Sequence, residues 1–171
     1  EEDRETFLRL VEVSDAIVEN FRAGALERWG LGYPELSRRN PGIVLTRVTG
    51  FGQDGPYSHR VSYDRMGIAM GGLTFLSGDP DRMPVRPGLA ICDYITGAFN
   101  ALATLVALHY RNGRGGGRGQ SIDVAQYETI YRITGFLTTE YQLRGKVRER
   151  EGNHYSKVAP SGNYRTREGK W

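Results

Sequence analysis

Apolar side chains recur at three- and four-residue steps in two long stretches of the chain. In the first, the repeating positions are Ile95, Ala98, Phe99, Leu102, Leu105, Val106 and His109. This spacing predicts an amphipathic helix that ends before Asn112-Gly113, with His109 packed inside it. The same period over 127–141, where several residues are aromatic, predicts a second long helix.

Shorter apolar runs predict strands. They lie at 15–19, 43–49 and 121–124, and the run at 43–49 is the strongest. Helical patterns occupy 6–13, 25–29, 33–38 and 66–70. Helices that alternate with buried strands predict an α/β fold, here a Rossmann-like open parallel sheet with flanking helices.

The last part of the chain differs in composition. Residues 145–153 are rich in charge, and 159–171 has the pattern of a strand, a turn and the start of another strand. We therefore predict a large α/β domain over 1–150, and a linker with the start of a smaller domain over 151–171. The chain begins without Met inside an acidic helical stretch, so we expect an internal portion of a longer protein.

The composition of the chain excludes or disfavours several classes of protein. The single Cys92 excludes an internal disulfide framework and a cysteine-based zinc site, which favours a reducing, cytoplasmic location. The three histidines are scattered, so we expect no metal site. A net charge of +3 suits small phosphate-rich ligands, but without a nucleic-acid motif we expect no nucleic-acid partner. We also expect no membrane segment, because no apolar run approaches the length of a span.

Asp93 stands where the tight apolar segment 87–92 runs into the predicted helix. It would occupy the N-cap or the first turn. There the helix dipole and unpaired backbone N–H groups favour an ionised carboxylate, the form that a carboxylate nucleophile needs. From spacing alone, a helix-capping role is the favoured explanation of Asp93, and the motifs around it change that preference.

Two turns follow predicted strands, at the sheet edge where parallel sheets bind ligands. The first carries Asn20, Phe21 and Arg22, an amide, a ring and a guanidinium. The second, 50–57, contains three glycines, which let backbone approach a ligand closely. No Lys-Ser or Lys-Thr follows these glycines, so this is not a nucleotide P-loop. Ordinary polar loops would explain both turns as well.

Taken in order, these motifs resemble the family III CoA-transferases of the CaiB/BaiF, formyl-CoA transferase-like type. The resemblance covers nearly the whole chain. It is carried by Asp15–Gly24, Gly50–Tyr57, Tyr63-Asp64, Gly88–Asp93 with Gly97, and Gly119–Val124. One departure is Ala23, which stands where the family's Asn-Phe-Arg turn commonly has proline.

The resemblance implies that Asp93 is the nucleophile. Its carboxylate would attack an acyl-CoA to give a mixed anhydride, and CoA thiolate would convert this into an aspartyl-CoA thioester. A carboxylic acid acceptor then reverses these steps. Coenzyme A is therefore implied as a substrate, with no tightly bound cofactor. The family also implies an interlocked homodimer of the complete protein.

The resemblance also assigns the CoA-binding residues. They are Asn20, Phe21, Arg22, Arg28, Arg60, Val61, Ser62 and Tyr63. Asp64, Gly50 and Gly52 would not contact the substrate themselves but would position the residues that do. Asp64 would either influence Asp93 as a second acid or cap the helix that it begins.

Two other functions stay open. The α-methylacyl-CoA racemases of the same superfamily have a His where Tyr63 stands, and they need two acid–base groups. A phenol, with a reference pKa near ~10, is a poor base at neutral pH, which favours a transferase. A non-catalytic CoA- or nucleotide-binding module would keep Arg22 and Arg28 but would have no need of Asp93.

Overall fold

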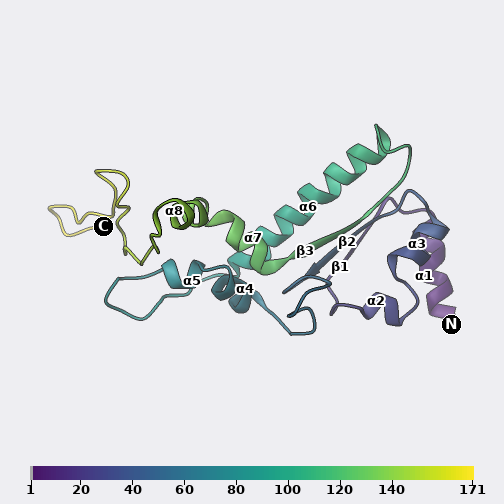
Figure 1. Cartoon of the computed structure of the whole chain (residues 1–171), viewed down its shortest axis with the longest axis horizontal. Coiled ribbons are helices and arrows are strands. Elements are labelled where there is room, and N and C mark those ends of the chain that lie inside the picture. Colours follow the sequence, from purple (N-terminus) through teal and green to yellow (C-terminus); the bar gives the residue numbers. More distant parts are fainter. Residues whose placement is uncertain (1) are drawn as a thin grey trace.

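The computed structural model describes residues 2–171. The chain is elongated, with a small sheet and three helices at one end and an irregular segment at the other (Figure 1). A long helix crosses the sheet between these ends.

The sheet has three parallel strands, β1 (Ala16–Glu19), β2 (Val44–Thr49) and β3 (Ser121–Ala125), in the order β1-β2-β3. Ile17 pairs with Leu45, and Thr46 pairs with Ile122. The first four residues of β2, the central strand, are buried. This confirms the α/β prediction of an open parallel sheet.

Helices α1 (Glu2–Glu12), α2 (Ala25–Arg28) and α3 (Tyr33–Arg39) form a core against one face of the sheet. The buried side chains of this core are Leu8, Val11, Leu26, Leu31, Leu36, Ile43 and Leu45. Successive strand residues point to opposite faces, so the neighbouring Thr46 lies on the other side. All three helices match the sequence prediction to within a few residues.

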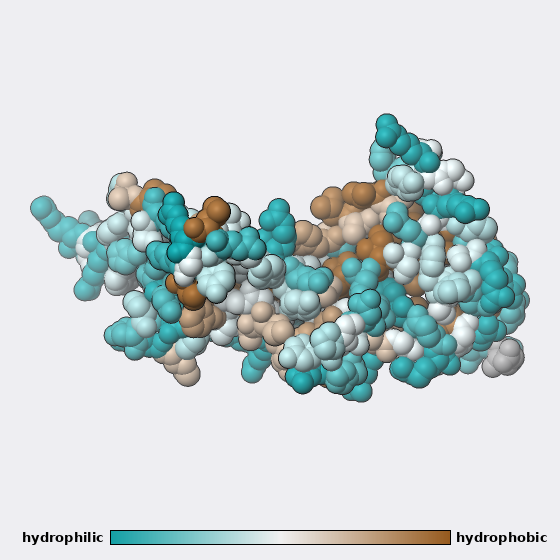
Figure 2. Space-filling view, in the orientation of Figure 1, coloured by the Kyte–Doolittle hydropathy of each residue, from teal (hydrophilic) through white to brown (hydrophobic). Residues whose placement is uncertain are grey.

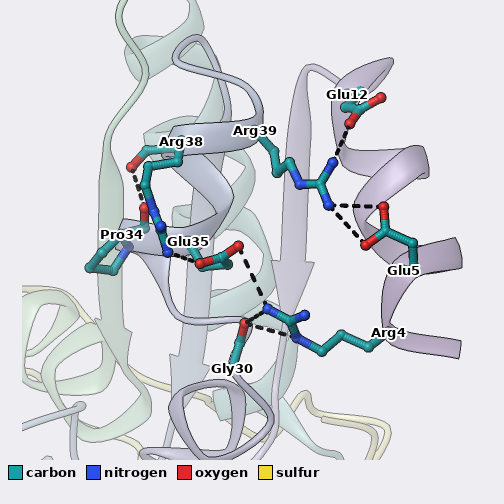
Figure 3. Close-up of polar contacts among 9 residues, drawn as sticks. Arg4, Glu5, Glu12, Gly30, Pro34, Glu35, Arg38 and Arg39 are labelled. Carbon is teal, nitrogen blue, oxygen red and sulfur yellow. Dashed lines mark hydrogen bonds and ion pairs between the residues drawn. The ribbon is translucent and has the colours of Figure 1, made fainter. Parts of the chain in front are cut away.

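Polar contacts tie α1 to α3 at the surface (Figure 3). The Arg39 guanidinium forms ion pairs with Glu5 at 2.8 Å and with Glu12 at 3.0 Å. Arg4 donates to the carbonyl oxygen of Gly30 at 3.1 Å. Exposed pairs of this kind contribute about 0–1 kcal/mol each.

The long helix α6 (Ile91–Asn112) packs on the opposite face of the sheet, against α4 (Asp64–Met70) and α7 (Gln126–Ile133). The hydroxyl of Thr104 on α6 donates to that of Thr46 at 3.4 Å. A second core, formed by Ile68, Cys92 and Ile130, joins the three helices.

The buried face of α6 is not the one that the sequence predicted. Its buried residues are Cys92, Thr96, Asn100 and Ala107. Leu105 is 65% exposed, Leu102 and Val106 are also exposed, and apolar side chains gather over α6 in Figure 2. His109 is exposed as well, so its predicted packing is wrong. The periodicity located an apolar stripe, but the small and polar side chains beside it face the sheet.

Helix α6 also corrects the expectation that no apolar segment approaches the length of a membrane span. Its 22 residues are long and apolar enough by length and composition. A single helix of this kind is weak evidence for a membrane, because core helices of soluble proteins meet the same criteria.

Three further segments differ from the predictions. The stretch 127–141 forms two helices, α7 and α8 (Leu137–Arg144), because Gly135 between them has a φ of 71°. A short helix α5 (Leu73–Leu76) was not predicted. The described residues 145–171 contain no strand, so the strand-turn-strand prediction is wrong. A turn closes there instead, with the backbone N–H of Thr166 donating to Lys170.

Candidate active site

A cavity of about 550 Å³ opens where β1 and β2 end. Its walls are the turn after β1, the segment 58–63 and the first turns of α6. This is the position at which open parallel sheets bind ligands. Most of the predicted site residues meet there, namely Asn20, Phe21, Arg22, Gly50, Arg60, Val61, Ser62, Tyr63 and Asp93. Arg28, Gly52 and Asp64 are not part of its lining.

Glu19 holds the turn that carries Asn20, Phe21 and Arg22. Glu19 is 5% exposed, and its carboxylate accepts hydrogen bonds from the backbone N–H of Phe21 and from Nε of Arg47, both at 2.7 Å. Arg47 also donates to both oxygens of Glu27, at 2.7 and 3.0 Å. This hydrogen bond lowers the pKa of Glu27 below its ordinary value, against the opposing effect of burial. The first wall of the cavity is therefore fixed to β2 and α2.

Arg28 lies beside this turn rather than on the cavity wall. Its Nη1 donates to the carbonyl oxygen of Ala23 at 3.4 Å. The structure therefore separates Arg28 from Arg22, which lines the cavity.

The second wall depends on a glycine at the end of β2. A Cβ atom on Gly50 would lie 1.9 Å from Cβ of Ser62, so only glycine lets the segment 60–63 lie this close. The Arg60 guanidinium stacks over the Tyr57 ring, 4.2 Å from its centroid. Gly52 has a φ of 89° and belongs to the turn behind this wall.

Asp93 lies in the first turn of α6, as predicted, and lines the cavity. Its Oδ1 accepts a hydrogen bond of 2.7 Å from Nε2 of Gln126. Burial raises the pKa of Asp93, the negative charge of Asp64 raises it further, and the Gln126 hydrogen bond opposes both effects. The net direction is opposite to the one that the helix N-terminus alone led us to expect.

Asp64 caps a different helix from the one that it begins. Its Oδ1 accepts a hydrogen bond of 2.9 Å from the backbone N–H of Cys92, in the first turn of α6. It lines a second cavity of about 530 Å³ together with Arg65, Arg86 and Tyr63. Tyr63 lines both cavities.

Two residues that sequence reasoning missed also line the first cavity, Asn100 and Gln126. Asn100 is 6% exposed, and neither its Oδ1 nor Oε1 of Gln126 has a hydrogen-bond partner among residues 2–171. Both residues left a signal in the sequence. Asn100 follows Asp93 by seven residues, on the same helix face, and Gln126 comes directly after the strand β3.

Among the described residues, no group of three or more His, Cys, Asp or Glu side chains is placed to hold a metal ion. The cavity is lined instead by carboxylate, amide, guanidinium, hydroxyl, aromatic and aliphatic side chains.

Comparisons with known proteins agree on one family. The sequence model described as CoA-transferase family III matches residues 1–171. In Chloroflexus aurantiacus, the succinyl-CoA–L-malate CoA-transferase beta subunit is 44% identical over 99% of this chain, and the succinyl-CoA–D-citramalate CoA-transferase is 47% identical over 95%. The aligned parts are 42% and 40% of those proteins, so this chain spans about two fifths of their length.

Comparison with solved structures indicates the same family. The crystal structure of a CaiB/BaiF family protein from Brucella suis matches with a TM-score of 0.88 and 37% sequence identity. The match covers 99% of this chain and 44% of that protein. The chain therefore belongs to CoA-transferase family III.

Proposed function

We propose that the complete protein transfers coenzyme A between an acyl-CoA thioester and a carboxylic acid, with Asp93 as the nucleophile. The observation that carries this proposal is the carboxylate of Asp93 on the wall of a 550 Å³ cavity, held by Gln126. Arg22 and Arg60 line the same cavity. A nucleophile and two phosphate-binding cations in one cavity are what a reaction on acyl-CoA needs.

The walls suit a CoA nucleotide. Arg22 and Arg60 would bind its phosphates, and Phe21 would pack against the adenine ring. The unpartnered Oδ1 of Asn100 would accept a hydrogen bond from an amide N–H of the pantetheine arm. Coenzyme A is then a substrate, and the proposal needs no tightly bound cofactor.

The proposed chemistry proceeds through acyl groups on Asp93. Oδ2 attacks the thioester carbonyl carbon, a C–O bond forms, the C–S bond breaks and CoA thiolate leaves. The thiolate then attacks Cγ of Asp93, forms a thioester and releases the first acid as its carboxylate. An acceptor carboxylate reverses the two steps. One negative charge is conserved throughout, and water must be excluded because it would hydrolyse either intermediate.

The two arginines of the second cavity support a dicarboxylic substrate. Arg65 and Arg86 line it, and neither forms an ion pair with another described residue. Tyr63 connects it to the cavity of Asp93. The relatives are named for succinyl-CoA, L-malate and D-citramalate. We propose that these guanidinium groups bind the carboxylate of a dicarboxylic acyl group that lies away from the reacting end.

Assembly and location remain proposals too. We propose the homodimer that the family resemblance implies, in a cytoplasmic protein. Because some relatives are named as alpha and beta subunits, size measurement of the complete protein should include co-expression with a paralogous chain.

Isotope exchange tests the proposed function. The complete protein is incubated with succinyl-CoA and ¹³C-labelled succinate, and label in succinyl-CoA is followed by mass spectrometry. Exchange should be abolished in Asp93→Asn and retained in Asp79→Asn, a matched change on the exposed loop outside both cavities. Equal exchange by the two variants would contradict the proposal.

The two alternatives predict different isotope exchange. A racemase would exchange the α-proton of an acyl-CoA with D₂O, without any acid acceptor. Tyr63, which stands where the racemases have a His, is well exposed and lines both cavities. A binding module would bind CoA without exchange, and Asp93→Asn would not alter its affinity.

A further inference from the structure

We propose that Gln126 is a catalytic residue, whose side-chain amide stabilises the oxyanion that forms on Oδ1 of Asp93 during transfer. This inference rests on the proposed function, since it requires acyl chemistry at Cγ of Asp93. It adds a residue that the sequence analysis did not assign to the site.

The backbone at Gln126 is fixed against α6. Gln126 is the first residue of α7 and directly follows β3. Its carbonyl oxygen accepts hydrogen bonds from the hydroxyl of Thr129 at 2.8 Å and from Sγ of Cys92 at 3.5 Å. Cys92 is the neighbour of Asp93 in the chain. The amide of Gln126 is therefore held close to the carboxylate by contacts that do not involve its own side chain.

The hydrogen bond distinguishes the two oxygens of Asp93. Nε2 of Gln126 donates to Oδ1 at 2.7 Å, whereas no described residue donates a hydrogen bond to Oδ2. The unbound Oδ2 is the oxygen available to attack the thioester. Oδ1 then becomes the carbonyl oxygen of the anhydride and, later, of the aspartyl thioester.

Charge develops on Oδ1 in two of the four steps. When CoA thiolate attacks Cγ of the anhydride, the C–S bond forms and the carbonyl electron pair moves onto Oδ1 until the acid leaves. The acceptor carboxylate produces the same oxyanion when it attacks the thioester. A donor belongs about 2.7–3.1 Å from such an oxygen, and the loss of one donor typically costs ~10²–10³-fold in kcat. In the other two steps the charge develops on the substrate, beyond the reach of this contact.

If Gln126 acted only by changing the pKa of Asp93, its removal would have a different pH dependence from the loss of an oxyanion donor. Gln126 also opposes the rise in the pKa of Asp93 that burial and Asp64 cause. If that were its whole role, its removal would reduce activity only at low pH, where Asp93 is protonated. An oxyanion donor is needed at every pH. The pH profile therefore separates the two roles. The titratable groups beside Asp93 are Asp64 and Cys92, and the charged or titratable groups that line the same cavity are Glu19, Arg22, Arg60 and Tyr63.

The test compares Gln126→Leu with Gln142→Leu in the complete protein. Gln142 lies on α8, is exposed and lines neither of the two cavities, so it receives the same change without the contact. With succinyl-CoA and ¹³C-succinate as probes, Gln126→Leu should lower kcat about 10²–10³-fold at every pH from about 6 to 9, with a similar KM for succinyl-CoA. A kcat at about pH 8.5 within roughly threefold of the control would overturn the proposal.

A second variant keeps the test valid if Gln126→Leu does not fold. In Gln126→Glu the introduced carboxyl can donate to Oδ1 only while it is protonated, so kcat should fall as pH rises. In the wild-type protein, by contrast, kcat should rise with pH as Asp93 ionises. Wild-type kcat in this variant at about pH 8.5 would overturn the role of Gln126. No exchange by the wild-type protein would overturn the proposed function and this inference together, whereas wild-type exchange with unaffected Gln126 variants would overturn only the inference.

Discussion

The carboxylate of Asp64 accepts a hydrogen bond of 2.9 Å from the backbone N–H of Cys92, and so joins the start of α4 to the first turn of α6. This bond satisfies one of the unpaired N–H groups at the helix end that presents Asp93. The negative charge of Asp64 also raises the pKa of Asp93, as a smaller cause than burial. One residue therefore fixes the helix turn that carries the proposed nucleophile Asp93 and opposes its ionisation.

Asp64→Asn separates these two effects, because asparagine keeps the acceptor oxygen and loses the charge. The proposed role of Asp93 requires its ionised form, so activity should be lost as pH falls through the pKa of Asp93, which is raised above its ordinary value. Without the charge of Asp64, the acid limb of kcat/KM should move to lower pH. The control is Asp79→Asn, and an acid limb that stays in place or moves to higher pH would contradict this interpretation.

Arg47 is expected to be essential for stability. It is 6% exposed, and its removal leaves Glu19 buried without its cation. Arg47→Ala should therefore lower the free energy of unfolding by about 3–5 kcal/mol. Arg39→Ala, which breaks the exposed pairs with Glu5 and Glu12, should cost about 1 kcal/mol or less. Denaturant unfolding of both variants measures the difference, and equal losses would argue against the buried network.

Cys92 should be chemically inert in the folded protein. Burial raises the pKa of its thiol to about 11, and the side chain is 0% exposed. Little thiolate exists at about pH 8, so iodoacetamide should label the native protein far more slowly than the unfolded protein. The mass of the peptide that contains Cys92, after digestion of the labelled complete protein, reports this site directly. Rapid labelling under native conditions would show that α6 opens readily.

Arg22 and Arg28 should differ in their effect on substrate binding. Arg22 lines the cavity, whereas Arg28 contacts the backbone of Ala23 beside it. Arg22→Ala should raise the KM for succinyl-CoA by roughly tenfold, the effect of losing a charged hydrogen bond, and Arg28→Ala should raise it less. The reverse order in steady-state kinetics would mean that Arg28 is the phosphate ligand.

The sequence predicted the sheet and the place of Asp93 because both depend on local signals. Runs such as 43–49 form buried strands almost regardless of their neighbours, and a helix start next to a carboxylate is readable from a few residues. It was wrong about the buried face of α6, since periodicity marks an apolar stripe but not what packs against it. The break at Gly135 was missed for a similar reason, because the aromatic spacing continues on both sides of it.

The two cavity residues that were missed show a different limit. Asn100 is an amide inside a predicted helix and Gln126 stands directly before one, positions where such residues are usually solvated. Only the structure shows that Gln126 comes within 2.7 Å of Asp93, which is 33 residues away in the chain. The available signals were the place of Gln126 directly after a predicted strand and the place of Asn100 seven residues after Asp93, on the same helix face.

The most direct test of this account is to measure, during turnover, the mass of the peptide that contains Asp93. The complete protein is incubated with succinyl-CoA, quenched in acid and digested, and the peptide that contains Asp93 is analysed by mass spectrometry. We predict a covalent succinyl or CoA adduct on Asp93, and none in Asp93→Asn. Isotope exchange by a protein that carries no adduct on Asp93, or carries one on another residue, would contradict the account.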